Sequence, residues 1–349
     1  MPDNKNHHYV PRCHFKPFTL NEEGKAINLY TSGKQILIPK VPVKSQCAHD
    51  YFYGVDLRLE TELAQIEGRY ATSLRRVVAG DDTHEDLHLL RFFAYLQLRR
   101  TEIAMTRIKE AEDAMLTDVP EHVMPPDTLE SIMITSMKVC AEAQHLVTDL
   151  KVRIIKNRTE VDFVTSDDPA IATNKWMSQK MNTEGFGVMS SGFILVMPLT
   201  PRLAILCYDG QVYTIPSLVG GRVILKKTED VESLNELQYL KAAANIYFAS
   251  WGMAEYVRDR FEEARPRRIT DWVITRFYLL VSDDGNQRTF KEVSQEETRV
   301  PNSRSIVHTA FRYPVPSTWL SHLKYRSPIK TFSHGTGAGH VRNEAWLES

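Results

Sequence analysis

The segment "NHHYVPRCHF" at residues 6–15 gathers histidines, a tyrosine and an arginine before the first strong helix or strand pattern of the chain. A neutral imidazole can act as an acid, a base or a metal ligand near neutral pH. We therefore take His8 as the leading candidate for a catalytic acid or base, with Tyr9 beside it and Arg12 as a candidate substrate contact. The alternative, that His8 only ties the N-terminal segment to the core, stays open.

Charged side chains interrupt the apolar stripes of two predicted helices. Residues seven apart in a helix differ by only about 20° around its axis. Glu60 and Glu67 therefore lie in one row on the first helix. On the second helix, Gln97 and Arg100 each follow an apolar residue by seven, which turns them toward the packed side. Gln97 is a candidate substrate contact.

A buried charge is costly unless it is paired and hydrogen-bonded. We therefore expect Arg100 to meet Glu60 or Glu67 across the helix pair. Three interpretations stay open: a buried ion pair that fixes the helix register, a working polar site, or simple exposure at the edge of the stripe.

A predicted strand ends abruptly at a polar turn within "EVDFVTSDDPAI", residues 160–171. Ser166, Asp167 and Asp168 precede a proline, and Asp and Ser before Pro favour a turn held by local side-chain hydrogen bonds. Two adjacent carboxylates with a hydroxyl can also coordinate a hard cation or orient a water. Asn235, on a later predicted helix, is a candidate substrate contact, with a polar face at the helix start as the simpler alternative.

The hydrophobic pattern predicts the elements that must position these candidates. We expect a small N-terminal β unit, long amphipathic helices, then a mainly antiparallel sheet with C-terminal helices and a strand in "WVITRFYLLV". Helices are expected at residues 56–78, 84–115, 127–150, 229–248 and 255–265. Helices followed by strands, rather than alternating β and α units, predict an α+β fold.

The chain is expected to form a single α+β domain over residues 1–300. Its parts are the N-terminal β unit at 1–53, a helical part at 54–150, and sheet with helices at 151–300. Residues 301–349 are punctuated by Pro and Gly, which predicts a loosely packed C-terminal tail.

Composition narrows the classes of function. The 349 residues are 42% hydrophobic and 25% charged, as in ordinary globular proteins. The net charge of −1 gives no global attraction to nucleic acid or an anionic membrane, so any such binding must be local. Four cysteines without paired spacing predict neither a disulfide framework nor a cysteine-rich zinc module. Without an apolar leader or a long uncharged apolar run, we expect a cytoplasmic protein that does not enter a membrane.

Several motifs in a fixed order resemble one known family. They are "HYVP" at 8–11, "LETELAQIE" at 59–67, "LQLRRT" at 96–101, "FVTSDDP" at 163–169, "MPLTP" at 197–201 and "LNELQ" at 234–238. Together they resemble the uncharacterised prokaryotic HYVP family, a domain of unknown function numbered 4238. Members usually carry Asn where this chain has Asp168, and an aromatic residue where it has His14. The resemblance implies a shared fold and a shared site that includes His8 and Tyr9, and it supplies no established activity.

The activity we expect is metal-assisted hydrolysis of a phosphodiester, as by a nuclease of a prokaryotic defence or toxin system. The ligands of a Mg²⁺ or Mn²⁺ ion would be Glu60, Glu67, Asp167 and Asp168. The catalytic residues would be His8, Tyr9, Arg100 and Ser166. In this hypothesis His8 activates water and Arg100 stabilises the developing phosphate charge, while Arg12, Gln97 and Asn235 contact the substrate.

The alternative is a non-catalytic module, in which the same residues form a buried polar network that recognises a ligand or shapes a partner surface. No nucleotide cofactor is expected, because "GTGAGH" at 335–340 lacks the strand, helix and lysine of a phosphate-binding loop. Nucleic acid is the partner that the hydrolase hypothesis implies, and a protein partner or a homo-oligomer stays open. Both hypotheses require His8, Glu60 or Glu67, Arg100 and the Ser166–Asp167 turn to converge in one concave site.

Overall fold

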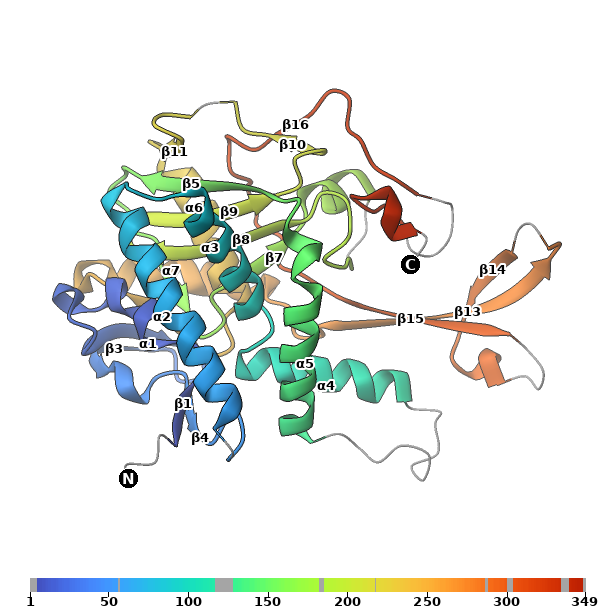
Figure 1. Cartoon of the computed structure of the whole chain (residues 1–349), viewed down its shortest axis with the longest axis horizontal. Helices are drawn as coiled ribbons and strands as arrows, with labels where there is room; N and C mark the ends of the chain where they lie inside the picture. The colour runs from blue at the N-terminus through green and yellow to red at the C-terminus, as the bar shows by residue number, and fades with distance from the viewer. Residues whose placement is uncertain are drawn as a thin grey trace.

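The computed structural model describes residues 5–55, 57–116, 128–181, 185–216, 218–285, 288–299, 304–333 and 339–347. A body of helices and sheets carries a long three-stranded arm that projects from one side (Figure 1). Helices and mixed sheets share the body, so the predicted α+β class is confirmed. Among the described residues, no helix is both long enough and apolar enough to cross a membrane.

The N-terminal strands join strands from much later in the chain. β2 (Ala26–Thr31) and β3 (Ile36–Pro42) form an antiparallel pair, as the sequence predicts. β12 (Asn245–Phe248) pairs with β2, and β6 (Thr165–Ser166) pairs with β12, which gives a sheet of order β3-β2-β12-β6. The polar turn that follows β6 is therefore attached to the sheet that holds the N-terminal segment.

A five-stranded sheet forms the centre of the body. Its strands, in order across the sheet, are β11 (Arg222–Leu225), β5 (Lys151–Asn157), β9 (Leu203–Tyr208), β8 (Ile194–Thr200) and β7 (Ile171–Thr173). β11 and β5 are parallel, and all other neighbours are antiparallel. The main hydrophobic core lies between this sheet and the helices, with α2 and α3 in front of the sheet in Figure 1.

The helices before this sheet correct one prediction. α2 (Arg58–Ala79) and α5 (Leu129–Glu142) occupy the first and third predicted helices. The predicted helix at 84–115 is wrong as a single helix, because the structure has α3 (His84–Gln97) and α4 (Glu102–Leu116) there. Thr101 accounts for the break, since its hydroxyl accepts a hydrogen bond from the backbone N–H of Ala104 at 3.3 Å and so caps the start of α4.

The predicted helix at 229–248 is wrong near its end. α6 (Thr228–Lys241) stops at Lys241, and the chain then enters β12. The Asp167 carboxylate accepts hydrogen bonds from three successive backbone N–H groups after α6, and these groups therefore do not continue the helical ladder. Tertiary contacts here override the high helix propensity of the alanine run.

One further helix, α7 (Ala254–Ala264), confirms the prediction at 255–265. The body also contains several short elements. They are α1 (Arg12–Phe15), β1 (Asn6–His8), β4 (Ala48–Asp50), β10 (Tyr213–Thr214) and β16 (Lys324–Tyr325), with β1 paired to β4 and β10 to β16.

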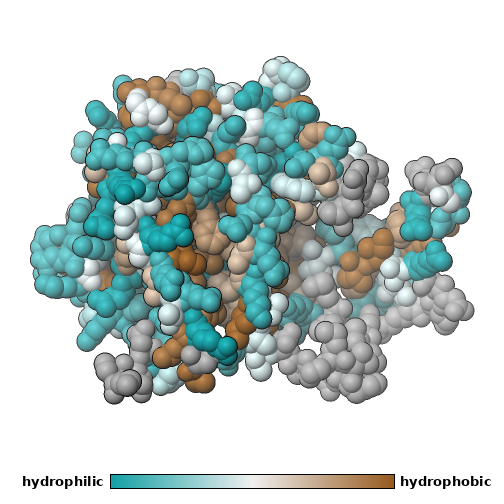
Figure 2. Space-filling model, in the orientation of Figure 1, coloured by the Kyte–Doolittle hydropathy of each residue, from teal (hydrophilic) through white to brown (hydrophobic). Residues whose placement is uncertain are grey.

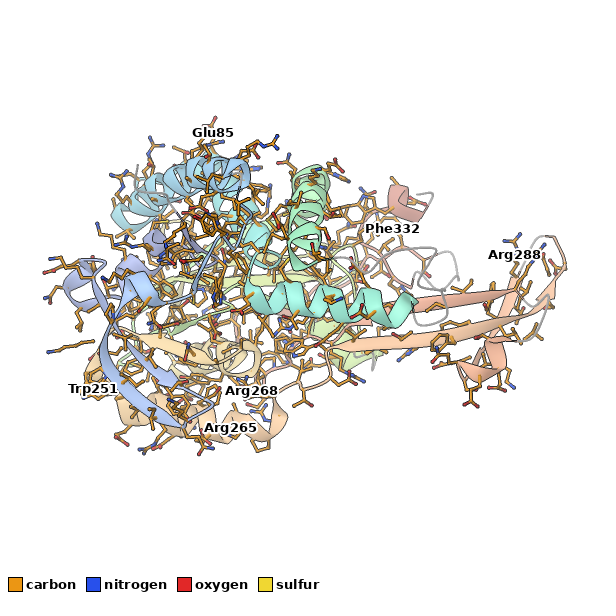
Figure 3. The ribbon with its side chains drawn as sticks, turned by 90° about the horizontal axis from the view of Figure 1, so that it is seen from below. Glu85, Trp251, Arg265, Arg268, Arg288 and Phe332 are labelled. Carbon is orange, nitrogen blue, oxygen red and sulfur yellow. The ribbon has the colours of Figure 1, made fainter. Side chains whose placement is uncertain are left out.

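The arm is an antiparallel sheet of β13 (Val273–Asp283), β14 (Arg288–Val293) and β15 (Ser305–Phe311), with β13 in the middle. The strand predicted in "WVITRFYLLV" is confirmed as β13. Arg288 lies at the far end of the arm (Figure 3). Apolar side chains lie along the arm between its root and its tip, on the face that Figure 2 shows.

Residues beyond 300, for which we expected a loosely packed tail, contribute both β15 and buried side chains. Leu320, Leu323 and Val341 are buried, and Arg342 is fully buried. The guanidinium of Arg342 donates a hydrogen bond from Nε to Asp149 at 2.9 Å. These contacts hold parts of the C-terminal region against the body.

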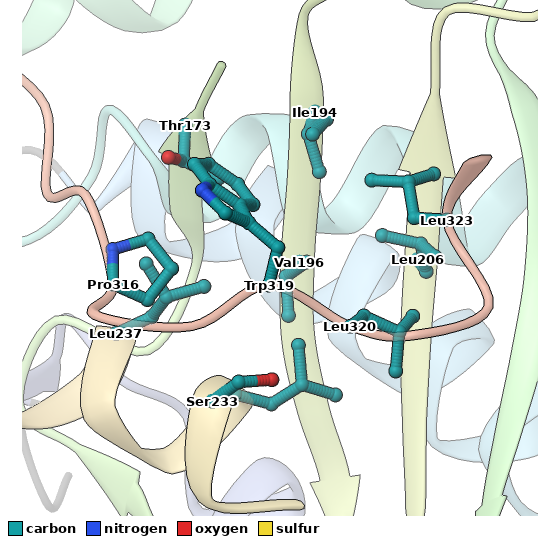
Figure 4. Close-up of a pocket in the computed structure, with 11 residues that line it drawn as sticks. Thr173, Ile194, Val196, Leu206, Ser233, Leu237, Pro316, Trp319, Leu320 and Leu323 are labelled. Carbon is teal, nitrogen blue, oxygen red and sulfur yellow. The ribbon is translucent and has the colours of Figure 1, made fainter. Parts of the chain in front are cut away.

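A small apolar pocket lies where residues 314–323 cross the central sheet next to α6 (Figure 4). Its volume of about 20 Å³ is roughly that of a single water site. Its two hydroxyl groups already donate to backbone carbonyls, Thr173 to Pro314 and Ser233 to Asp230. The pocket therefore belongs to the packing of the core.

Candidate functional site

Arg100 lies at the centre of a buried polar network. Its side chain is 0% exposed, and Nη2 donates to Glu67 Oε1 at 2.7 Å and to the backbone oxygen of His8 at 3.0 Å. Nε donates to the hydroxyl of Tyr53 at 3.0 Å. The helix spacing thus predicts the partner of Arg100 correctly. Glu60, about two turns before Glu67 on α2, is half-buried and lies close enough to Tyr53 to act on its pKa.

His8 and Tyr9 enter this network through their backbone carbonyls. Gln97 Nε2 donates to the Tyr9 oxygen at 2.7 Å, as Arg100 does to the His8 oxygen. The His8 ring contacts the backbone oxygen of Gln46 at 3.1 Å. Burial lowers the pKa of His8 to about 4, an effect that the hydrogen bond to Gln46 opposes and the nearby guanidinium groups reinforce. The ring is therefore neutral at pH 7 and a weak base.

Asp168 is the centre of a second buried network. Its carboxylate accepts hydrogen bonds from Arg107 Nη1 at 2.8 Å and from Thr101 Oγ1 at 3.1 Å, and it pairs with Lys241 Nζ at 2.7 Å. Lys241 also donates to the backbone oxygen of Ala170 at 2.7 Å. Burial lowers the pKa of Lys241 to about 8, although the adjacent Asp168 carboxylate acts in the opposite direction. Two cations thus share one carboxylate.

The Asp167 carboxylate binds the backbone of the turn between α6 and β12. Its oxygens accept from the N–H groups of Ala243 at 2.8 Å, Ala244 at 2.7 Å and Asn245 at 2.8 Å. Burial raises the pKa of Asp167 to about 6, against the effect of these three hydrogen bonds. A carboxylate held by three donors in this way fixes the junction between α6 and β12.

The other predicted polar residues of this region also bind to α6 or lie on it. Ser166 Oγ donates to Gln238 Oε1 at 2.7 Å and accepts from the N–H of Asp168 at 3.2 Å. Asn235 donates to the backbone oxygen of Asp162 at 2.8 Å and accepts from the N–H of Val164 at 3.0 Å. The strand-end turn is therefore anchored to one side of α6.

The two networks meet because Arg100 and Thr101 are consecutive residues. Arg100 binds Glu67 and the His8 carbonyl, while Thr101 binds Asp168. The predicted segments do meet, and Arg100, Ser166, Asp167 and Asp168 are buried where they do. Arg12, predicted to contact substrate, is exposed on α1.

Three of the four predicted metal ligands already bind other groups in these networks. Glu67 pairs with Arg100, Asp167 binds three backbone N–H groups, and Asp168 pairs with Arg107 and Lys241. Within the part of the chain that the structure describes, no group of three or more His, Cys, Asp or Glu side chains is arranged to hold a metal ion. A metal at Glu67, Asp167 or Asp168 would have to displace the cations or the backbone N–H groups that these carboxylates already bind.

His14 is a buried residue whose role the sequence does not reveal. Its ring nitrogens contact the hydroxyl of Tyr70 at 2.9 Å and that of Thr165 at 3.2 Å. Burial lowers the pKa of His14 to about 3. The neutral ring therefore links α1 to α2 and β6, which explains how a histidine can occupy this aromatic position.

A large cleft lies between the body and the root of the arm, with a volume of about 1770 Å³. Its described lining contains six cationic side chains, Arg99, Arg107, Lys241, Arg276, Arg288 and Arg312, and a single carboxylate, Asp283. It also contains eight aromatic side chains, Tyr95, Phe186, Phe193, Trp272, Tyr278, Phe290, Phe311 and Tyr313. A chain with a net charge of −1 thus concentrates positive charge and aromatic rings in one place.

One face of the arm supplies much of this lining. Ile274, Arg276 and Tyr278 alternate along β13, and Ile306 and His308 continue the same face on β15. Alternate residues of a strand point to the same side of the sheet. The arm therefore presents a face of aliphatic, aromatic and basic side chains to the cleft.

Asp168 lies beneath this cleft and positions two of its cations. Arg107 and Lys241 both line the cleft and both pair with Asp168. The guanidinium of Arg107 also lies over the ring of Trp272, 3.5 Å from its centroid. The buried network and the root of the arm are therefore joined through Arg107.

The sequence analysis missed Arg99, Arg107 and Lys241. Arg107 follows Arg100 by seven residues, and Lys241 interrupts the apolar run "YLKAAAN", so both carry the signal of an inward-facing charge that singled out Arg100. Arg99, in "LRR", has no such signal, because only the position of the arm makes it part of a cleft.

Comparison with known proteins places the chain in a family without assigning it an activity. The family model described as "Protein of unknown function (DUF4238)" matches residues 6–251. No curated protein and no solved structure matches the chain.

Proposed function

This chain belongs to the DUF4238 family, and we propose that it binds single-stranded nucleic acid, without cleaving it, in the cleft between the body and the arm. The observation that carries this proposal is the joint lining of the cleft by six cationic and eight aromatic side chains. Proteins that bind single strands combine a positive groove that follows the phosphates with aromatic rings on which bases stack.

The distribution of charge supports a polyanionic ligand. Arg276, Arg288 and Arg312 have carboxylate partners in Glu292, Asp283 and Asp271, but these are pairs at the molecular surface. Exposed ion pairs contribute little free energy, so a phosphate can replace the carboxylate at small cost. Binding that releases counterions from phosphates also weakens steeply with added salt.

The aromatic lining favours unpaired bases over a duplex. Trp272 at the root of the arm, Tyr278 on β13 and Phe290 on β14 follow the cleft outward from the body. Stacking of a base on an aromatic side chain contributes about 1–3 kcal/mol and requires a base whose face is accessible. A paired base has both faces covered within the helix.

The buried networks serve as the scaffold of this cleft. Asp168 holds Arg107 and Lys241 at its floor, and the Arg100 network holds the N-terminal segment against α2 and the link between α3 and α4. This arrangement supports a binding module better than a metal-assisted hydrolase, because Glu67, Asp167 and Asp168, three of the four predicted metal ligands, already bind other groups. The nuclease hypothesis stays a prediction that the same experiment tests.

The experiment is titration of a fluorescein-labelled oligothymidine strand with the purified protein, followed by fluorescence anisotropy. We expect the single strand to bind, the matching duplex to bind more weakly, and Arg276→Glu to weaken binding by about tenfold or more. Arg260→Glu is the matched control, because Arg260 pairs with Glu263 on α7 and is as exposed as Arg276, at 43% against 42% of the side chain.

Equal losses in both variants, or no binding by the unmodified protein, would contradict the proposal. The same strand incubated with Mg²⁺ or Mn²⁺ is then analysed for cleavage. Cleavage that Asp167→Ala abolishes would replace the binding module by the metal-assisted hydrolase.

A further inference from the structure

We propose that the inner end of the cleft, formed by Tyr95, Arg99, Arg107 and Tyr313, is a pocket for the terminal phosphate of the bound strand. This inference rests on the proposed function and adds to it the part of the ligand that the protein recognises. The shared chemistry is a phosphate monoester, which can lie at the 5′ or the 3′ end of the strand.

Arg99 is a cation that lines the cleft without an anionic partner. It forms no ion pair with a carboxylate among the described residues, in contrast to its neighbour Arg100. Its guanidinium lies 5.7 Å from the centroid of the Tyr95 ring. A guanidinium presents several donors in one plane, which suits a phosphate oxygen pair.

Two buried polar atoms next to Arg99 lack a hydrogen-bond partner among the described residues. They are the hydroxyl of Tyr95 and Nε of Arg107. Tyr95 is 1% exposed and Arg107 7% exposed, and both line the cleft. A buried donor without a partner costs free energy, so such atoms at the wall of a cleft indicate a ligand that supplies the acceptors.

Tyr313 lines the same cleft as Tyr95, Arg99 and Arg107. Burial raises the pKa of its phenol, an effect that the two guanidinium groups oppose. Its ring also stacks on Phe186, with centroids 4.4 Å apart, which fixes its position at the wall.

The local charge matches a terminal phosphate better than a phosphodiester. Arg99, Arg107 and Lys241 are three cations of the cleft lining, and among the described residues Asp168 is the one carboxylate that pairs with them. Two positive charges are therefore left for the ligand. A phosphate monoester carries between about 1.5 and 2 negative charges at pH 7, whereas an internal phosphodiester carries one.

The depth of the cleft also favours the end of a strand. Its lining extends from Tyr95, Phe193, Lys241 and Arg107, which are buried in the body, to Arg288 at the far end of the arm (Figure 3). An internal phosphate needs room for the chain to enter and to leave. A terminal phosphate needs only one opening.

The experiment compares the affinities of three oligothymidine strands of equal length, carrying a 5′ phosphate, a 3′ phosphate or no terminal phosphate. Each strand is labelled at an internal base, and binding is measured by anisotropy. We expect one phosphorylated strand to bind about tenfold more tightly than the unphosphorylated strand, which also identifies the end that enters the cleft.

Tyr95→Phe is the sharpest variant, because it removes a hydroxyl that makes no well-formed hydrogen bond among the described residues and that lies close enough to Arg99 for the guanidinium to act on its pKa. We expect an unchanged melting temperature and loss of most of the preference for the phosphorylated strand. Arg99→Gln should also reduce this preference. Arg276→Glu is the control: it should weaken the binding of all three strands and leave their ratio unchanged.

Equal affinity for the three strands would overturn the terminal-phosphate pocket and leave the proposed function standing. A preference that survives in both Tyr95→Phe and Arg99→Gln would overturn the location of the pocket. Failure of every strand to bind would instead overturn the proposed function, and this inference with it.

Discussion

Arg99 and Arg100 are consecutive residues in two regions that treat positive charge in opposite ways. Arg100 is fully buried and bonds to Glu67, Tyr53 and the His8 carbonyl. Arg99 lines the cleft and has no carboxylate partner among the described residues. A buried cation with anionic and carbonyl partners stabilises the fold, whereas a cation without them, at the wall of a cleft, is available to a ligand. Two consecutive residues therefore differ in role: Arg100 belongs to the buried scaffold, and Arg99 belongs to the surface of the cleft.

The largest effect expected from this comparison is on stability. Arg100→Met should lower the free energy of unfolding by about 3–5 kcal/mol, because Glu67 and the His8 carbonyl lose their donor. Glu67 keeps 26% of its side chain exposed, which places the expected loss at the lower end of this range. Urea denaturation gives the free energy of unfolding of Arg100→Met and of the matched variant Arg99→Met. Similar losses in the two variants would remove the distinction between them.

Asp168 connects the scaffold to the cleft, and its replacement should affect both. Asp168→Asn leaves Arg107 and Lys241 close together without a carboxylate, so we expect a loss of about 2–4 kcal/mol. Adding Lys241→Met should restore part of this loss, since it removes one of the two cations. Denaturation of the two single variants and the double variant gives the coupling energy. Strictly additive losses would show that the pair does not interact as the structure indicates.

The pH dependence of stability should report the buried state of His14. Burial lowers its pKa from 6.5 to about 3, so the unfolded chain binds a proton between these values and the folded protein does not. The free energy of unfolding should therefore fall with decreasing pH over this window, by about 1.4 kcal/mol per pH unit. His14→Phe should reduce this slope between pH values of about 6.5 and 5. An unchanged slope would show that His14 is protonated in the folded protein.

The smallest effect expected is on the affinity for a single-stranded oligonucleotide. It distinguishes the two faces of the β-strand β13. Tyr278 faces the cleft on β13, whereas Phe277 does not line it. Tyr278→Ala should weaken binding by about 1–2 kcal/mol through loss of one stacked base. Phe277→Ala should leave the affinity within about twofold. Anisotropy titrations distinguish the two variants. A larger loss of affinity in Phe277→Ala would place the bound oligonucleotide on the face of β13 that points away from the cleft.

Local patterns in the sequence predicted the parts of the fold that depend on neighbouring residues. The period of apolar residues gave α2, and spacing by seven placed Arg100 toward Glu67. The errors occur where distant residues intervene. Thr101 caps α4 while its hydroxyl also binds Asp168, and Asp167 ends α6 by capturing the N–H groups that follow it.

The cleft could not be predicted for the same reason. Its walls come from residues near 95–108, 185–193 and 272–313, which lie far apart in the sequence. Arg107 and Lys241 carry a signal of inward-facing charge, but nothing in the local sequence shows that an arm lies opposite them. Asp168, a predicted metal ligand, pairs with Arg107 and Lys241, two cations of the cleft lining.

Photo-crosslinking tests the central claim most directly, because it locates the strand on the protein. An oligonucleotide that contains 5-iodouracil is bound, irradiated and digested with the protein, and the linked peptides are identified by mass spectrometry. We predict crosslinks to the aromatic residues of the cleft, Trp272, Tyr278 and Phe290 above all. Crosslinks confined to α2, α7 or other surfaces outside the cleft would contradict the account.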